Sequence, residues 1–233
     1  MDMATTTDQD DPALAELRLR QLTSAAVPVG AFAYSHGLES AVELGWVSNA
    51  DQAREWLGGV LRQVVAGVEV PLLARLMAAC AHGDDDAARR WSALLLALRD
   101  TAELRAQERA LADAWCALLG TLGVPGAAAW ADAPQRTALA LYALGVAHYG
   151  VGVPAAARAL LWSWLEGQVS AAVRAVQLGH GAGQRVLYAL AGQIPAAAAC
   201  GLALADEEIG GGAPALGIAS CRHETQYSRL FRS

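Results

Sequence analysis

The sequence predicts an all-α fold, a single compact bundle of about eight to ten helices. Hydrophobic residues make up 55% of the chain, and Ala and Leu, which favour helices, carry most of this share. Apolar residues recur at helical spacing between short breaks that contain Gly or Pro, and short connections favour antiparallel neighbours. Because only 17% of the 233 residues are charged, the chain has ample material for one core.

We divide the chain into three parts. Residues 1–12 contain four Asp and neither a basic nor a long apolar run, so we predict a disordered acidic leader and no secretory signal. Residues 13–209 form the helical domain. Residues 210–233 are predicted to be a flexible Gly-rich joint followed by a polar, aromatic and Arg-rich tail that binds partners.

The first elements of the domain are predicted from apolar spacing and from helix ends. We expect a short helix over 13–21, an ordered loop at 27–30 where Pro and Gly disfavour a helix, and a helix over 38–44. Gly45 ends this last helix, because glycine accepts the left-handed conformation that follows many helices.

Helix caps predict the next elements. Ser48, followed three residues later by Asp51, resembles a capping box for a helix through Val64, and Pro71 is expected to kink or restart that helix. The acidic run 84–86 favours the start of another helix.

The second half of the domain is predicted in the same way. A long amphipathic helix is expected over 100–119, with Glu103, Glu108 and Arg109 facing outward. Four further helices, separated by Gly and Pro, are expected near 134–149, 155–176, 180–191 and 195–206.

One stretch raises the question of a membrane span. Residues 137–157 carry no Asp, Glu or Arg and are long enough to cross a bilayer. The stretch is rich in Ala, contains Gly150 and Pro154, and lacks flanking aromatic residues, so we predict a buried pair of helices broken near Gly150 and no membrane. An integral membrane protein is the alternative, which soluble expression would exclude.

Charge and cysteine content exclude several functions. A net charge of −6 with no basic block argues against nucleic-acid binding. All basic residues are Arg, which excludes a Walker A lysine, a Schiff-base lysine and a lysine general base. The four cysteines are widely separated and form no CxxC pair, so we expect reduced thiols and a cytoplasmic protein.

No standard catalytic motif is present. The alternative is an enzyme that uses Tyr34, Ser35 and His36, but Ser35 does not stand in a GxSxG motif. Cys221 and His223 are residue types that ligate soft metals, and two ligands are too few for a tight site. We therefore predict no catalytic residues, no metal site and no cofactor.

Two stretches, the loop that ends at Glu39 and the C-terminal tail, instead mix aromatic and polar side chains in the way that interfaces do. A tail that docks onto its own bundle is the alternative to a partner-binding tail. The partner-binding residues predicted from the two stretches are Phe32, Tyr34, Ser35, His36 and Glu39 in the first, and Arg222, His223, Glu224, Tyr227, Arg229, Phe231 and Arg232 in the second.

Three segments resemble the urease accessory protein F (UreF) family, and the resemblance extends over nearly the whole chain. Residues 27–39, PVGAFAYSHGLE after Val27, are similar to the family signature PVGAFSYSxGLE. Residues 161–185 resemble a second family segment, and residues 222–233, RHETQYSRLFRS, resemble the family's terminal segment.

The second segment departs from the family pattern. Arg174 stands where the family usually has Lys, Gln177 where it has Pro, and His180 where it has Gln. Charge at position 174 is kept, although arginine and lysine are not interchangeable. We expect Arg174, His180, Gln184 and Arg185 to line a face that meets a GTPase or lets nickel pass.

The resemblance implies a UreF-like fold and a homodimer. It also implies a non-catalytic chaperone that assembles with UreD (also called UreH), the GTPase UreG and the urease apoprotein, and that matures urease by nickel insertion. The assembled complex would handle nickel, and the chain would modulate the GTPase. The alternative is a helical interaction protein outside the urease pathway.

Overall fold

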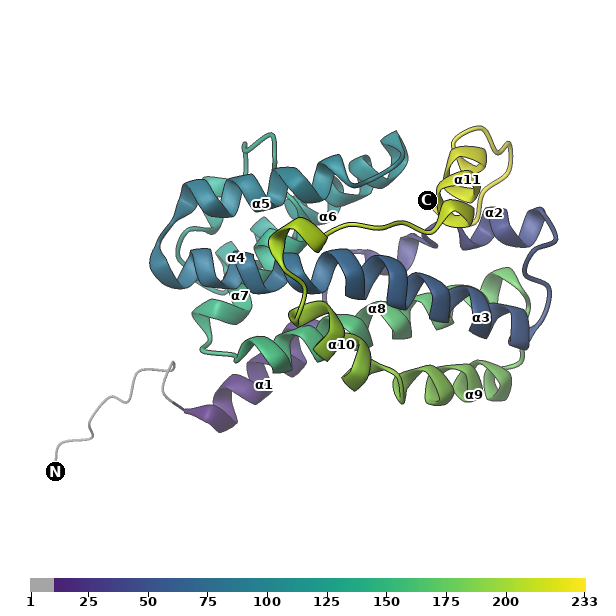
Figure 1. Ribbon diagram of the computed structural model, residues 1–233, viewed down its shortest axis with the longest axis horizontal. Helices are drawn as coiled ribbons and strands as arrows, with labels where there is room; N and C mark the ends of the chain where they lie inside the picture. Colours follow the sequence, from purple (N-terminus) through teal and green to yellow (C-terminus); the bar gives the residue numbers. More distant parts are fainter. Residues whose placement is uncertain (1–10) are drawn as a thin grey trace, which may run out of the picture.

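The computed structural model describes residues 11–233, and this part of the chain is helical and contains no strand (Figure 1). Residues 1–10 of the predicted leader lie outside the described range. Residues 11–12, which were predicted to belong to the disordered leader, are instead ordered at the start of α1 (Pro12–Thr23). The carboxylate of Asp11 caps this helix, because it accepts hydrogen bonds from the N–H groups of Ala13 and Leu14.

The described residues contain eleven α-helices, and α3 and α4 belong to one continuous helix, so ten separate helices result. This number confirms the predicted fold class. The helices after α1 are α2 (Leu38–Glu43), α3 (Ala50–Val60), α4 (Val70–His82), α5 (Asp85–Ala97), α6 (Ala102–Thr121), α7 (Ala138–His148), α8 (Val153–Ala175), α9 (His180–Ala191), α10 (Ile194–Leu202) and α11 (Pro214–His223).

A helix of 33 residues, Ala50–His82, forms the spine of the fold. Of the two predicted effects of Pro71, a kink or a restart, the restart is wrong, because a π-helical segment, Leu61–Glu69, precedes the proline and passes directly into α4. The N–H of Val70 bonds to the carbonyl of Val65, five residues back. The π-helical spacing shifts the hydrogen bonds just before Pro71, so the helix passes the proline, which has no N–H, without a break.

Side-chain caps fix the starts of the neighbouring helices. Asn49, and not Ser48, caps the spine, because its amide oxygen accepts the N–H of Gln52 at 3.0 Å. Asp84 caps α5 and Thr101 caps α6 through the N–H groups three residues on, close to the predicted start of each helix. Helix α7 starts later than expected because its cap is Thr137.

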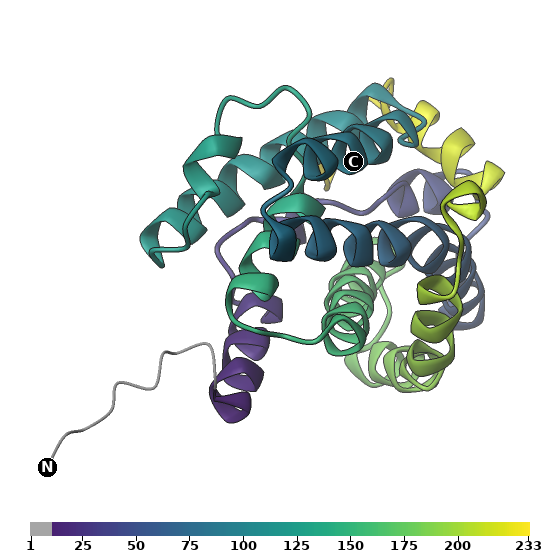
Figure 2. The same cartoon turned by 60° about the vertical axis from the view of Figure 1, so that its left-hand side comes forward.

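The other helices surround the spine (Figures 1 and 2). Helix α4 packs against α5, α7 and α8, while α9 and α10 pack on α8 and cover α3 and the π-helical segment. Helix α1 crosses α7 and α8, and α11 lies against α2. Leucines dominate the fully buried side chains, in agreement with the predicted single core.

The last part of the chain differs from the predicted joint and tail. Residues 214–223 form α11, and the segment that follows packs back onto the domain, with Phe231 and Ser233 buried. The tail therefore docks on its own bundle, and partner binding by its exposed residues stays a prediction.

Residues 137–157 form two helices divided at Gly150, as predicted, since this glycine has a φ of +67°. By length and composition, one helix in residues 11–233, the spine, passes the test for a membrane span, and α9 with α10 passes only if their 42° bend is ignored. Of the most apolar part of the spine, 61% is buried inside the protein, which is typical of a core helix.

Candidate partner-binding site

The loop before α2 and the end of the chain, far apart in sequence, form one structural unit. The N–H of Arg232 donates to the carbonyl of Ala33 at 2.8 Å. The carbonyl of Ser233 accepts both the N–H and the hydroxyl of Ser35, each at 2.6 Å. Two of the three predicted segments are thus brought together, with Ser35 and Ser233 buried between them.

Glu39, at the start of α2, anchors the same junction. Its carboxylate accepts the backbone N–H groups of Leu230 at 2.7 Å and Phe231 at 2.9 Å. The side chains of Gln226 and His223 approach it at 3.3 Å. Glu39 was predicted to bind a partner, but it is buried and holds the chain's own terminal segment in place.

His36 links this junction to the core. Its Nδ1 accepts the indole N–H of Trp164 at 3.0 Å, and its Nε2 lies within hydrogen-bond distance of the amide nitrogen of Gln107. Gln107 also bonds to the hydroxyl of Ser233. Although the residue is of intermediate exposure, its ring is enclosed by these groups, and burial lowers the pKa of His36 to about 3.

We expect His36 to make the protein less stable in acid. The unfolded chain takes up a proton near pH 6.5 and the folded chain only near pH 3, so the free energy of unfolding falls as the pH falls between these values. His36→Asn, which suits the positive φ of 49°, should lower this slope by up to about 1.4 kcal/mol per pH unit.

Urea unfolding at several pH values measures how the free energy of unfolding depends on pH, and His82→Asn, at an exposed residue, is the matched control. A slope that His36→Asn leaves unchanged would contradict it.

Arg174, at the end of α8, joins the two segments from the side. Its guanidinium donates to the carbonyl of Phe32 at 2.8 Å and lies 4.4 Å from the ring centroid of Phe231. The planar group stacks on the ring while it donates, which a lysine ammonium does less well.

The other residues predicted in the second segment lie elsewhere. His180, Gln184 and Arg185 are exposed on α9, which packs on α3 and α8 and lies across the molecule from α11 in Figures 1 and 2. The predicted site residues are therefore divided between two surfaces.

The outer face of the junction is accessible and apolar. Tyr227 is fully exposed, Leu230 is 72% exposed and Phe32 is 68% exposed. Tyr227 and Leu230 line a groove of about 410 Å³, together with Glu39, Val42, Glu43, Ala175, Gln226 and Ser228. We call Phe32, Tyr227, Leu230 and this groove the junction surface. Of the other predicted residues, Arg222, Glu224, Arg229 and Arg232 are exposed, whereas Tyr34, His223 and Phe231 are buried.

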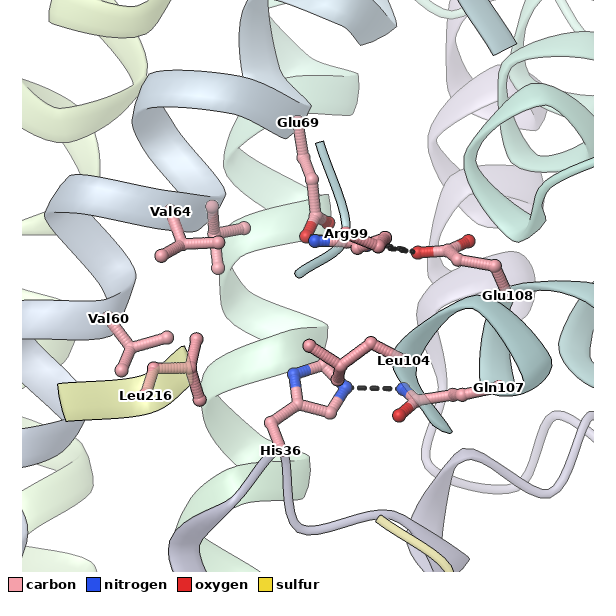
Figure 3. Close-up of a pocket in the computed structure, with 10 residues that line it drawn as sticks. His36, Val60, Val64, Glu69, Arg99, Leu104, Gln107, Glu108 and Leu216 are labelled. Carbon is pink, nitrogen blue, oxygen red and sulfur yellow. Dashed lines mark hydrogen bonds and ion pairs between the residues drawn. The ribbon is translucent and has the colours of Figure 1, made fainter. Parts of the chain in front are cut away.

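A buried ionic cluster lies near His36 and Gln107 (Figure 3). Arg99 contacts Glu69 at 2.8 Å and also Glu108, and all three side chains are nearly inaccessible. They line a small cavity of about 20 Å³ together with His36 and Gln107. Burial raises the pKa of Glu69, and the two carboxylates hold the pKa of Arg99 above its ordinary value despite burial.

The position of Glu108 corrects the prediction that it faces outward. It is buried because Arg99 and the N–H of Ala138 give its carboxylate partners inside the protein. Apolar spacing also failed to identify Gln107 and Trp164 as part of the junction. A polar residue on the apolar side of a helix, such as Gln107, is the signal that was available.

Neither an enzyme that uses Ser35 and His36 nor a metal site at Cys221 and His223 is supported by the geometry of the described residues. The hydroxyl of Ser35 donates to Ser233 and the ring of His36 bonds to Trp164 and Gln107, so neither is arranged as nucleophile and base. Cys221 is exposed, while both ring nitrogens of His223 face carboxylates. Within residues 11–233, no group of three or more potential ligands gathers around a metal position.

Known proteins are similar to this chain over most of its length. Residues 47–191 match the model of the UreF family. The chain is 50% identical to the urease accessory protein UreF of Alkalilimnicola ehrlichii over 97% of this chain and 99% of that protein. It is 45% identical to the UreF of Alcanivorax borkumensis, covering 93% and 97%, and 40% identical to that of Hahella chejuensis, covering 95% and 100%.

Proposed function

The chain belongs to the UreF family of urease accessory proteins, and from this premise we propose that it is a scaffold that assembles with UreD/UreH and the GTPase UreG on the urease apoprotein for nickel insertion. It would work in the cytoplasm as a homodimer, modulate the GTPase and catalyse no reaction itself. Nickel would be handled by the assembled complex, and the chain would hold no cofactor.

The junction surface carries this proposal. Its exposed side chains stand on a segment whose backbone is held by Glu39, Ser35 and Ala33, so little conformational entropy is lost when a partner binds. Large aromatic and aliphatic side chains beside a groove are typical of interface anchors. We therefore assign the junction surface to the UreD/UreH contact.

The exposed face of α9 provides a second, separate surface. Tyr188 is 86% exposed there and lies on the same helix as His180, Gln184 and Arg185. We assign this face to the homodimer or to the GTPase. Light scattering of the purified protein, alone and with UreG, tests the two assignments.

We expect the double variant Tyr227→Ala with Leu230→Ala to weaken binding to UreD/UreH by about tenfold or more, because both side chains would be buried in the contact. Both are exposed in the chain alone, so the fold should be unaffected. Co-purification and titration calorimetry measure the loss. Leu17→Ala, which removes a 61% exposed side chain on α1, is the matched control.

Unchanged affinity in the double variant would remove the junction surface from the UreD/UreH contact. Failure of the wild-type chain to bind either partner would favour the alternative of an interaction protein outside the urease pathway. Turnover of a nucleotide or an ester by the purified chain alone would revive the enzyme alternative.

A further inference from the structure

A second groove, of about 310 Å³, lies between the first half of the spine and the segment that leads into α11. Figure 1 shows that segment passing along the spine before α11 begins. The spine contributes a stripe of residues at helical spacing, among them Gln52, Trp56 and Gln63, and the segment and α11 contribute Ala213 and Leu216. No residue of α9 or of the junction surface lines this groove, so it is a separate site.

The stripe on the spine gives the groove an elongated shape. A helix rises about 1.5 Å per residue, so Gln52 and Gln63 are separated by about 16 Å along its axis. Between them, Gly59 has no side chain, and a Cβ there would meet no atom within 4 Å. An extended chain rises about 3.3 Å per residue, so the groove has the length of about five residues of an extended segment.

Two amide side chains can bond to the backbone of such a segment. The amide oxygen of Gln52 accepts both the N–H and the hydroxyl of Ser48, each at 2.8 Å. These bonds fix the side chain, while its NH₂ group makes no hydrogen bond to residues 11–233. Gln63 is exposed and its amide makes none either within this range. Both therefore offer hydrogen-bonding groups to the peptide units of a bound segment.

The side chains that line the groove favour a cation. Trp46 is 40% exposed, and its ring centroid lies 6.3 Å from that of Trp56. The faces of tryptophan rings attract cations, because the ring quadrupole is negative there. Among the described residues that line the groove, Glu55 alone is charged, and it is exposed and makes no ion pair. Aromatic faces and an unpaired carboxylate thus occur in one groove.

No arginine of the spine takes this place. Arg54 pairs with Asp51, and Arg62 donates to the amide oxygen of Gln193 on the loop after α9. A phosphate or a carboxylate ligand would meet Glu55 without a basic lining residue to balance it, which disfavours anionic ligands.

We propose that this groove, which we call the tryptophan groove, binds an extended segment of a partner protein through an arginine side chain. The guanidinium stacks on the exposed tryptophan surface and pairs with Glu55, while Gln52 and Gln63 bond to the backbone of the segment. A planar guanidinium stacks and donates at the same time, which a compact ammonium does less well. The site lies outside both surfaces assigned above, so it does not rest on the proposed function.

The test uses the full-length chain labelled with ¹⁵N and a blocked peptide, acetyl-Gly-Ala-Arg-Ala-Gly-amide, as the probe. Titration to about 10 mM covers the weak binding expected of a short flexible peptide. We expect saturable shifts of the indole N–H signals of Trp46 and Trp56. The signal of Trp162, which is 39% exposed on α8, is the internal control and should stay in place.

Peptides with Gln, Lys or Pro in place of the central arginine identify what the groove recognises. All three should bind at least about threefold more weakly than the arginine peptide, because the first and last lack the charge and the second lacks the planar group.

Two variants of the chain test the residues. Glu55→Gln should weaken binding of the arginine peptide by about threefold or more, and Trp46→Leu should do the same by removing an aromatic face. Both residues are exposed, so the fold should be kept. Glu207→Gln makes the same change of charge at an exposed residue outside the groove and is the matched control.

Four results would overturn the proposal. The first is the lack of a saturable shift at Trp46 and Trp56 with the arginine peptide. The second is equal binding of the glutamine or proline peptide, which would show a groove for neutral segments. The third is equal binding of the lysine peptide, which would show recognition of charge alone. The fourth is a loss in Glu55→Gln no larger than that in Glu207→Gln.

Discussion

Replacing Arg99 with methionine is expected to lower the free energy of unfolding by about 3–5 kcal/mol, because it leaves two buried carboxylates without their partner. The Arg99 side chain is 11% exposed, and those of Glu69 and Glu108 are 10% and 8% exposed. Water therefore reaches none of the three well enough to replace the lost ion pairs. Urea unfolding followed by circular dichroism measures the change.

Two further variants identify the cause of that loss. Arg54→Met removes an exposed ion pair with Asp51 on α3 and should change the stability by less than about 1 kcal/mol. Adding Glu69→Gln and Glu108→Gln to Arg99→Met removes the unpaired charges, so part of the stability should return. If Arg99→Met matches Arg54→Met, the cluster does not contribute as its geometry implies.

Gly201→Ala is expected to destabilise the protein by about 3 kcal/mol, because the added methyl group has no space. A Cβ at this position of α10 would lie 2.2 Å from the carbonyl oxygen of Ala66 and 2.9 Å from the side chain of Val70. Backbone on the spine cannot move aside as a flexible side chain does, so α10 would shift from the spine. Thermal and urea unfolding measure the effect.

Gly167→Ala on α8 is the matched control for that substitution. A Cβ there would meet no atom within 4 Å, so this variant should stabilise the protein by about 0.5–1 kcal/mol, since alanine is the better helix former. Equal effects of the two substitutions would show that helix propensity, and not the close approach of α10 to the spine, decides both.

Local signals determined most of the helical boundaries. Asp84 and Thr101 offer oxygens to the first free N–H groups of α5 and α6, and Gly45 and Gly150 adopt positive φ values at breaks. These interactions span only a few residues, so the sequence alone contains the whole of their cause. The family was likewise identified from three segments of sequence.

Pro71 shows where a local signal was insufficient. Its missing N–H does act on the helix, but the π-helical turn before it accepts the change without a break, and packing of α4 against α5, α7 and α8 keeps the helix continuous. The sequence also did not distinguish Ser48 from Asn49 as the cap of the spine, because either side chain offers an oxygen to the first turn of the helix.

The site was predicted in part. Sequence reasoning identified the loop of residues 27–39 and the terminal segment as unusual, and the structure joins them through Ser35 and Glu39. It did not reveal that many of these polar residues serve the chain's own fold, with the junction surface carrying the accessible apolar side chains. Composition indicates an interface but does not indicate whether the partner is another protein or the chain's own helical domain.

The sequence by itself thus determined the helical class, most of the helix ends, the lack of lysine chemistry and the family, because each depends on residue type and short spacing. Only the tertiary structure decided that Glu108 is buried, that the terminal segment is docked, and that His223 lies between Glu39 and Glu103. These outcomes depend on partners more than one hundred residues away, or on a buried arginine in a neighbouring loop, and spacing within one helix does not encode such contacts.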